Sequence, residues 1–146
     1  MKFTCTTEIN APCEKTVKLF LDSSRYKEWQ DGFVSIQTIT GKPWEKGTHS
    51  KVIYKNGKMI IDLKETILMS KLPEVVTGLY EHEHMVNSMT NRFIAFDNLS
   101  TRYEAEIEYT KFIDIVPKLI ALLMPRFFKK QVQKRLDSFK NFVEKN

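Results

Sequence analysis

The stretch FKKQVQKRLDSFKNFVE, which runs from Phe128 to Glu144, decides the fold of this chain. Its apolar residues recur every three or four positions, and this spacing keeps them on one face of a helix with about 3.6 residues per turn. The stripe consists of Phe128, Val132, Leu136, Phe139 and Val143. The opposite face is charged, so we predict a terminal helix from about Pro117 to Glu144 with one dry side and one wet side. Because proline lacks an amide donor, Pro125 interrupts this pattern, and residues 117–124 are expected to form a separate turn or a kinked lead-in.

Upstream of this helix, a series of segments alternates between apolar and polar residues, as half-buried strands do. The clearest is Ser100–Tyr109, whose aromatic and aliphatic residues occupy odd positions from Tyr103 and whose charged residues lie between them. Asn56-Gly57 marks a hairpin, because a type I′ turn needs positive φ at both central residues. The predicted strands are Lys2–Ile9, Phe33–Thr40, Thr48–Lys55, Lys58–Met69, Glu74–His84, Met89–Asp97 and Ser100–Tyr109. The pattern therefore predicts an α+β fold with a curved, seven-stranded antiparallel sheet wrapped around the long C-terminal helix.

Two short helices are predicted between the first and second strands. Asn10 and Pro12 open the first helix, since an Asn side chain accepts an early amide and proline is preset for the first turn. Its buried stripe comprises Cys13, Val17, Phe20 and Leu21. The run Asp22-Ser23-Ser24 supplies caps for the second helix, which ends near Trp29. We expect the Trp29 indole to plug the core beneath these helices.

Several of these segments carry a resemblance to a known superfamily. They are Ile9-Asn10-Ala11-Pro12, the segment from Asp22 to Trp29, Gly47, Pro73, Thr101 and the ending from Leu136 to Glu144. Together they resemble the START-like, helix-grip (SRPBCC) superfamily, which groups polyketide cyclase and dehydrase-like proteins, lipid-transport domains and birch-pollen-allergen-like proteins. The resemblance covers nearly the whole chain. It implies a sheet that grips the C-terminal helix and encloses an apolar cavity, but it marks no catalytic branch.

The length of 146 residues suits one domain spanning 1–146, large enough to bury its own core. The net charge of +5 is local, because residues 118–146 contain eight basic and two acidic residues. A basic patch can bind nucleic acid, yet the chain has no aromatic-and-glycine strand signature, no zinc spacing and no short recognition helix. We therefore expect a solvated basic helix face and no nucleic-acid partner.

The chain shows no signal-peptide pattern near Met1, and its two cysteines do not suggest a disulfide framework. Its longest apolar stretch, residues 115–128, is broken by prolines and basic residues and is too short to span a bilayer. We expect a soluble protein in the reducing cytoplasm.

Few residues suggest chemistry. His82 and His84 share one strand face and are compatible with two metal ligands, but no third ligand stands at an informative spacing, so we predict no metal and no cofactor. Cys13 lies at a helix start, where its thiol pKa can fall, yet its place on the apolar stripe favours a buried, inert thiol. The chain contains no glycine-flanked nucleophile elbow and no phosphate-binding loop, so no catalytic residue is assigned.

Two regions are open to a peripheral membrane or protein contact. Trp44 lies in a hairpin loop among lysines, where it either folds back on the sheet or meets a partner. The segment 122–130 combines apolar residues with basic ones, as a membrane-docking segment does, and as a helix end that covers a cavity also does.

The predicted site is a cavity for a small apolar or amphipathic ligand between the sheet and the terminal helix. On the sheet it is lined by Met59, Ile61, Leu63, Glu65, Phe93, Tyr103, Ala105, Ile107 and Tyr109, and on the helix by Phe128, Val132, Leu136 and Phe139. Glu65 shares the apolar phase of its strand, where a carboxylate is costly. It therefore reaches solvent, pairs with an arginine such as Arg92, or orients the ligand. The phase of Met89–Asp97 stays open.

Three functions are compatible with this pattern. The first is a non-enzymatic binding or carrier domain, which we favour. The second is a cyclase or dehydratase-like enzyme in which Glu65, a tyrosine or His82 serves as general acid or base. The third is a protein-interaction or membrane-interaction module that uses the basic helix and Trp44. The identity of the ligand and the oligomeric state are not encoded in any motif.

Overall fold

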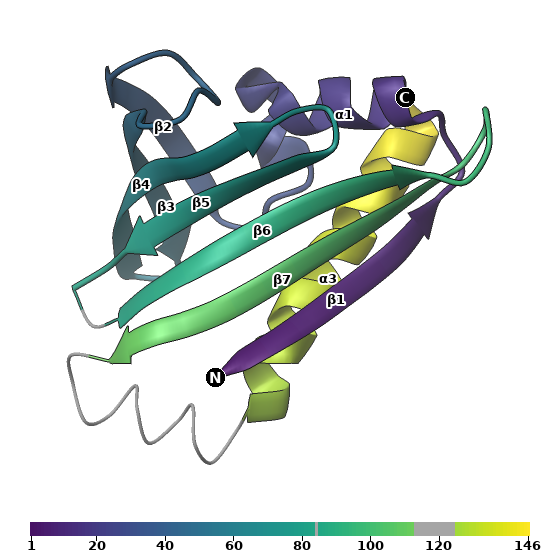
Figure 1. Ribbon diagram of the computed structural model, residues 1–146. Coiled ribbons are helices and arrows are strands. Elements are labelled where there is room, and N and C mark those ends of the chain that lie inside the picture. The colour runs from purple at the N-terminus through teal and green to yellow at the C-terminus, as the bar shows by residue number, and fades with distance from the viewer. Residues whose placement is uncertain (84, 113–124) are drawn as a thin grey trace.

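A computed structural model describes residues 1–83, 85–112 and 125–146 of the chain (Figure 1). Its strands pair antiparallel in the order β1-β7-β6-β5-β4-β3-β2, so that only the pairing of β1 with β7 joins distant parts of the chain. The elements are β1 (Lys2–Ile9), α1 (Cys13–Leu21), η1 (Ser23–Glu28), β2 (Phe33–Thr40), β3 (His49–Asn56), β4 (Met59–Lys71), β5 (Val75–Glu81), β6 (Met85–Ala95), β7 (Thr101–Phe112) and α3 (Pro125–Lys145). The predicted α+β fold with seven antiparallel strands is confirmed.

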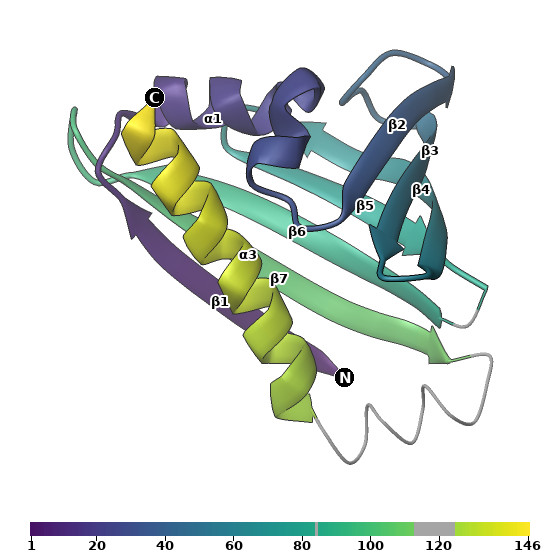
Figure 2. The same cartoon turned by 180° about the vertical axis from the view of Figure 1, so that it is seen from behind.

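The long helix α3 lies across one face of the curved sheet, alongside β1 and β7, while α1 and η1 close one end (Figure 2). It begins at Pro125, since proline is accepted in the first helical turn, where its missing amide would have no partner. The predicted apolar stripe is confirmed, with Leu136, Phe139 and Val143 fully buried. The predicted lead-in at 117–124 lies outside the described residues.

Strand β6 corrects the predicted boundaries. It starts at Met85 instead of Met89, so the prediction that residues 85–88 form a turn between two strands is wrong, and β5 ends at Glu81. Asn87 and Ser88 have weak strand preference, but β5 and β7 pair with them on both sides, and this pairing overrides local propensity. Phe93 is buried and Ile94 is exposed, which settles the open phase and turns Asn91 toward the interior.

The core is densest where α1 and η1 meet α3. The Phe20 ring lies 5.0 Å from Phe93, 5.9 Å from Tyr103 and 5.8 Å from Phe139, measured between ring centroids. Trp29 is buried 4.7 Å from Phe139, so the prediction that its indole plugs the core is confirmed. The cap of η1 is also as predicted, since the Asp22 carboxylate accepts a hydrogen bond from the Ser24 amide at 3.1 Å.

Candidate ligand cavity

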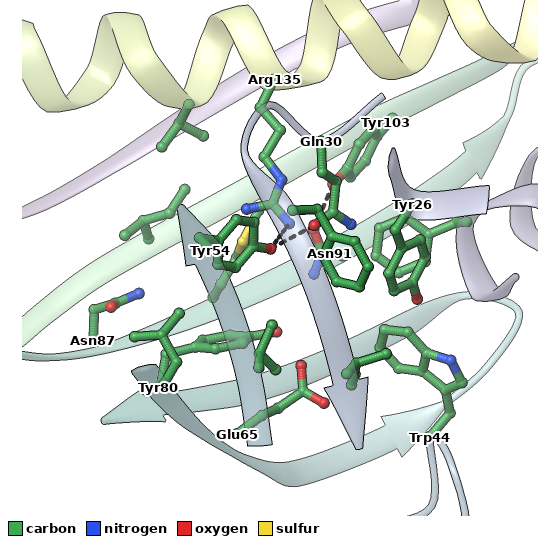
Figure 3. A pocket seen from close by; sticks show the side chains of 18 of the residues that line it. Tyr26, Gln30, Trp44, Tyr54, Glu65, Tyr80, Asn87, Asn91, Tyr103 and Arg135 are labelled. Atoms are coloured by element: carbon green, nitrogen blue, oxygen red, sulfur yellow. Dashed lines mark hydrogen bonds between the residues drawn. The ribbon is translucent and has the colours of Figure 1, made fainter. Parts of the chain in front are cut away.

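An inner cavity of about 190 Å³ lies between the sheet and α3 (Figure 3). Its apolar lining consists of Phe20, Phe33, Ile36, Trp44, Val52, Leu63, Met89, Ile107 and Val132. Its polar lining consists of Tyr26, Gln30, Tyr54, Glu65, Tyr80, Asn87, Asn91, Tyr103, Tyr109 and Arg135. An apolar cavity of about 150 Å³ can bind benzene. The inner cavity is therefore large enough for a group the size of one aromatic ring.

An outer cleft of about 360 Å³ adjoins the inner cavity, and six of the described residues line both spaces, including Tyr54, Val132 and Arg135. The residues that line the cleft alone are Trp29, Asp31, Lys55, Asn56, Ile61, Gln131, Lys134 and Ser138. The cleft thus runs between α3 and the end of the β3–β4 hairpin. The shared side chains form the boundary between the two spaces.

A close backbone approach fixes one rim of the outer cleft. The Lys55 amide donates a hydrogen bond to the Gly32 carbonyl at 2.7 Å. Gly32 has φ of 77°, and a Cβ at this position would lie 2.6 Å from the Lys55 carbonyl oxygen. Only glycine accommodates both conditions, so it ties the loop after η1 to the end of β3.

Glu65 places a carboxylate inside the inner cavity. It lies on β4 opposite Tyr80 of β5, and only 7% of its surface is exposed. Burial raises the pKa of the Glu65 carboxyl, while a hydrogen bond from Tyr80 and the positive charge of Arg135 act in the opposite direction. No nitrogen of a described Lys, Arg or His lies within 4.0 Å of this carboxylate.

The expected alternatives for Glu65, solvent or a pair with Arg92, are therefore wrong. Arg92 belongs to the outward phase of β6 and lies 3.8 Å from Glu106 on the other face of the sheet. Glu65 shares the inward phase of β4 with buried Ile67, and the strand continues to Lys71. It is therefore not a strand-end residue that can reach water.

Arg135 brings a positive charge to the boundary between cavity and cleft. Its Nη2 donates to the Tyr54 hydroxyl at 3.1 Å, and this hydroxyl donates in turn to the Gln30 side-chain oxygen. Its guanidinium carbon also lies 5.6 Å from the Trp29 ring centroid and 5.8 Å from that of Tyr54. These contacts hold the guanidinium between α3, β3 and the loop after η1. In Figure 3 Arg135 and Glu65 reach the cavity from opposite sides.

Two further polar groups are fixed at the cavity wall. The buried Tyr103 hydroxyl donates to the Asn91 side-chain oxygen at 2.7 Å, and burial raises the Tyr103 pKa far above its usual range. The Trp44 indole nitrogen donates to the Leu21 carbonyl at 3.3 Å, and its ring lies 5.4 Å from Phe20. Trp44 therefore folds back onto the protein, which confirms the first of its two predicted placements.

Apart from Met59, the predicted site residues divide into three groups. Leu63, Glu65, Tyr103, Ile107, Tyr109 and Val132 line the inner cavity, and Ile61 lines the outer cleft. Phe93, Ala105, Leu136 and Phe139 face inward but lie at neither space, because they fill the closed core. Phe128 packs 5.4 Å from Tyr109 and also lies at neither space.

Met59 requires a correction. It shares the inward phase of β4, yet it is 59% exposed. It directly follows the Gly57–Lys58 turn, which lies one residue later than the predicted Asn56-Gly57 turn, and no element of the described residues covers this end of the hairpin. Alternation predicts the direction of a side chain along a strand, but it does not predict how far the covering layer extends.

The sequence did not identify Arg135 and most residues contributed by α1, η1, β2 and β3. Arg135 carried a detectable signal, because it follows Val132 by three positions and precedes Phe139 by four. It therefore lies beside the apolar stripe rather than on the solvated face. The side chains from other elements come together only through the curvature of the sheet.

The remaining candidates have simple outcomes. Within residues 1–83, 85–112 and 125–146, no group of three or more His, Cys, Asp or Glu could hold a metal ion, and His84 lies outside these ranges. Cys13 is half-buried, and burial raises the pKa of its thiol. No helix of the described part is long and apolar enough to cross a membrane. In the segment 122–130, residues 122–124 are not described, and Phe127 is 46% exposed.

No protein-family model matches the chain, and no curated protein matches its sequence. Solved structures match its whole length. The Zhui aromatase/cyclase from Streptomyces sp. R1128 superimposes with a TM-score of 0.79 at 9% identity, covering 99% of this chain and 93% of that one. A START superfamily protein from Mycobacterium smegmatis gives a TM-score of 0.76 at 11% identity, covering 99% and 97%.

Norcoclaurine synthase from Thalictrum flavum, solved in complex with dopamine and hydroxybenzaldehyde, gives a TM-score of 0.71 at 12% identity, covering 100% of this chain and 87% of that one. These similarities define the class of fold. The chain has the helix-grip fold shared by START and aromatase/cyclase proteins, as the resemblance implied.

Proposed function

We propose that the protein binds a small amphipathic molecule in the inner cavity, with the apolar body between the sheet and α3 and a polar end at Glu65. The observation that carries this proposal is a buried carboxylate, without a charged partner in contact among the described residues, in a cavity lined largely by aromatic and aliphatic side chains. Such a group is costly unless something hydrogen-bonds to it. Tyr80 supplies one hydrogen bond to Glu65, and a ligand hydroxyl or amine would supply another.

The apolar lining supplies the driving force for binding. Covering aromatic and aliphatic surface contributes roughly 25 cal/mol per Å² removed from water. Small cyclic molecules are compatible with a cavity of about 190 Å³. Similarity to an aromatase/cyclase, and to a synthase solved with dopamine and hydroxybenzaldehyde, supports a guest with an aromatic ring.

Native mass spectrometry of protein from a heterologous host, followed by denaturing extraction, tests the proposal. We expect a reproducible small-molecule adduct that disappears in Val132→Phe, which adds a ring to a residue lining both spaces. Val34→Phe is the matched control, because Val34 is 42% exposed on β2 and lines neither space. An adduct of equal occupancy in both variants would place the ligand elsewhere and contradict the proposal.

One observation favours a second candidate, a cyclase-like or dehydratase-like enzyme. The pKa of Glu65 is raised by burial, and Tyr80 lies beside it, which is the environment of a general acid or base. The molecule extracted from Glu65→Gln distinguishes the two functions. A carrier should yield the same molecule from both proteins in different amounts, whereas an enzyme should leave its unconverted precursor on the variant.

A further inference from the structure

The guanidinium of Arg135 has more hydrogen-bonding capacity than its surroundings use. Arginine presents five N–H donors, and among the described residues Tyr54 is its one hydrogen-bond acceptor. No described carboxylate lies within 4.0 Å of it. Its other contacts are the faces of Trp29 and Tyr54, which position a cation without neutralising it. Donors are therefore left over at the boundary between the inner cavity and the outer cleft.

The outer cleft around Arg135 favours an anion. Among the described residues its charged lining is Lys55, Lys134 and Arg135 against the single acidic residue Asp31. The two lysines come from β3 and α3, on opposite sides of the cleft, and both are exposed. Gln131, Asn56 and Ser138 add neutral donors to the same lining. An anionic group placed here would meet one positioned guanidinium and two flexible ammonium groups.

We infer that the outer cleft is the subsite for an anionic group of the ligand, a carboxylate, sulfonate or phosphate, held by Arg135 with Lys55 and Lys134. This inference rests on the proposed function, because it assigns the second polar end of the molecule whose body fills the inner cavity. The ligand class is then an aromatic or alicyclic anion with a hydrogen-bond donor at its far end. Arg135 and Glu65 recognise the two ends from opposite sides of the cavity (Figure 3).

Two fluorescent probes with the same apolar body separate charge recognition from cavity binding. Anilinonaphthalene sulfonate is an anion, and N-phenylnaphthylamine is the same framework without the sulfonate. In either probe one ring suits the inner cavity, and the other rings extend into the adjoining outer cleft. We expect the protein to bind the anion about tenfold or more tightly than the neutral probe, because charge-assisted hydrogen bonds are stronger than neutral ones. Arg135→Gln should lower the ratio of the two affinities at least threefold, and this ratio is the readout because Arg135 also lines the inner cavity.

Two controls keep the test specific. Lys51→Gln removes an exposed lysine that pairs with Asp62 at 3.4 Å and lines neither space, so it should leave both affinities unchanged. If Arg135→Gln does not fold, the double variant Lys55→Gln/Lys134→Gln decides, because both side chains are exposed. It should weaken binding of the anion about threefold and reduce its salt dependence.

The outcomes separate the two proposals. Equal affinity for both probes, unchanged by the variants, would overturn the anionic subsite and leave the cavity function standing. Failure to bind either probe, or binding of both in Val132→Phe as in the original protein, would overturn the cavity function and the subsite with it. An anion preference lost equally in Lys51→Gln would reduce the effect to net charge and also overturn the subsite.

Discussion

The two halves of α3 pack against the same sheet with opposite results. In the C-terminal half, Leu136, Phe139 and Val143 are fully buried beneath α1 and η1. In the N-terminal half, Phe128 and Val132 continue the same stripe but are half-buried, and Arg135 at the junction faces the cavity and the cleft. The same apolar stripe of α3 thus borders a closed core in its C-terminal half and a cavity in its N-terminal half. The closed half holds the fold together, which leaves the open half free to carry polar groups.

Phe139→Ala should have the largest effect, because it removes the ring on which the closed half depends. Phe139 is fully buried, and its ring lies 4.7 Å from Trp29 and 5.5 Å from Tyr103. Deletion of a buried phenyl ring costs about 3–5 kcal/mol. Urea unfolding measures this change. Val132→Ala is the matched substitution in the open half and should cost less than about 1 kcal/mol, so similar costs for the two variants would contradict the division of α3 into two halves.

Tyr103→Phe tests the polar edge of the closed half. It deletes the donor of a 2.7 Å hydrogen bond and leaves the oxygen of Asn91, which is 3% exposed, without that partner. An unsatisfied buried acceptor costs about 1–3 kcal/mol. Tyr54→Phe should cost less than half as much, since Gln30 and Arg135 border the outer cleft, where water can replace the lost hydroxyl. The midpoints of chemical unfolding compare the stabilities of the two variants. A greater loss of stability in Tyr54→Phe would contradict the conclusion that water reaches Tyr54 but not the hydrogen bond between Tyr103 and Asn91.

Glu65→Gln should stabilise the ligand-free protein at neutral pH by about 1 kcal/mol. The several kcal/mol that burial of an ion costs are partly offset here by Tyr80 and Arg135. Burial raises the folded-state pKa of Glu65 above the ordinary value of 4.5, so the protonated form favours folding. The stability of the original protein should therefore fall as pH rises through the folded-state pKa.

Thermal unfolding at several pH values measures this difference. The advantage of Glu65→Gln should be greatest at neutral pH and disappear as the pH falls to 4.5, the ordinary pKa of a Glu carboxyl. An advantage that does not vary with pH would show that Glu65 does not titrate in this range. A loss of stability at pH 7 would show instead that the carboxylate is well paired in the free protein.

The closed half could be predicted from the sequence, and the open half only in part. Spacing in α3 identified Leu136 and Phe139, and alternation in β7 identified Tyr103 and Ile107, because periodicity reports which side of an element is dry. Arg135 was missed because a charged residue is normally assigned to the solvated face of a helix, even when it lies beside the apolar stripe. A cavity depends on sheet curvature and on where covering elements stop, and neither property has a local sequence pattern.

Met59→Ser should have the smallest effect and marks the limit of the open half. Met59 shares the phase of Ile61 and Leu63, yet 59% of it is exposed and it lines neither the cavity nor the cleft. A substitution at such a position usually changes stability by less than about 0.5 kcal/mol. Leu63 lies four residues further along the same face and lines both spaces, so Leu63→Ser should weaken binding of the neutral probe at least threefold. Probe titration of the two variants locates the edge of the ligand-binding space along β4. A loss of affinity in Met59→Ser would extend that space to the end of the hairpin, because the bound ligand would then have to cover a side chain that is exposed in the free protein.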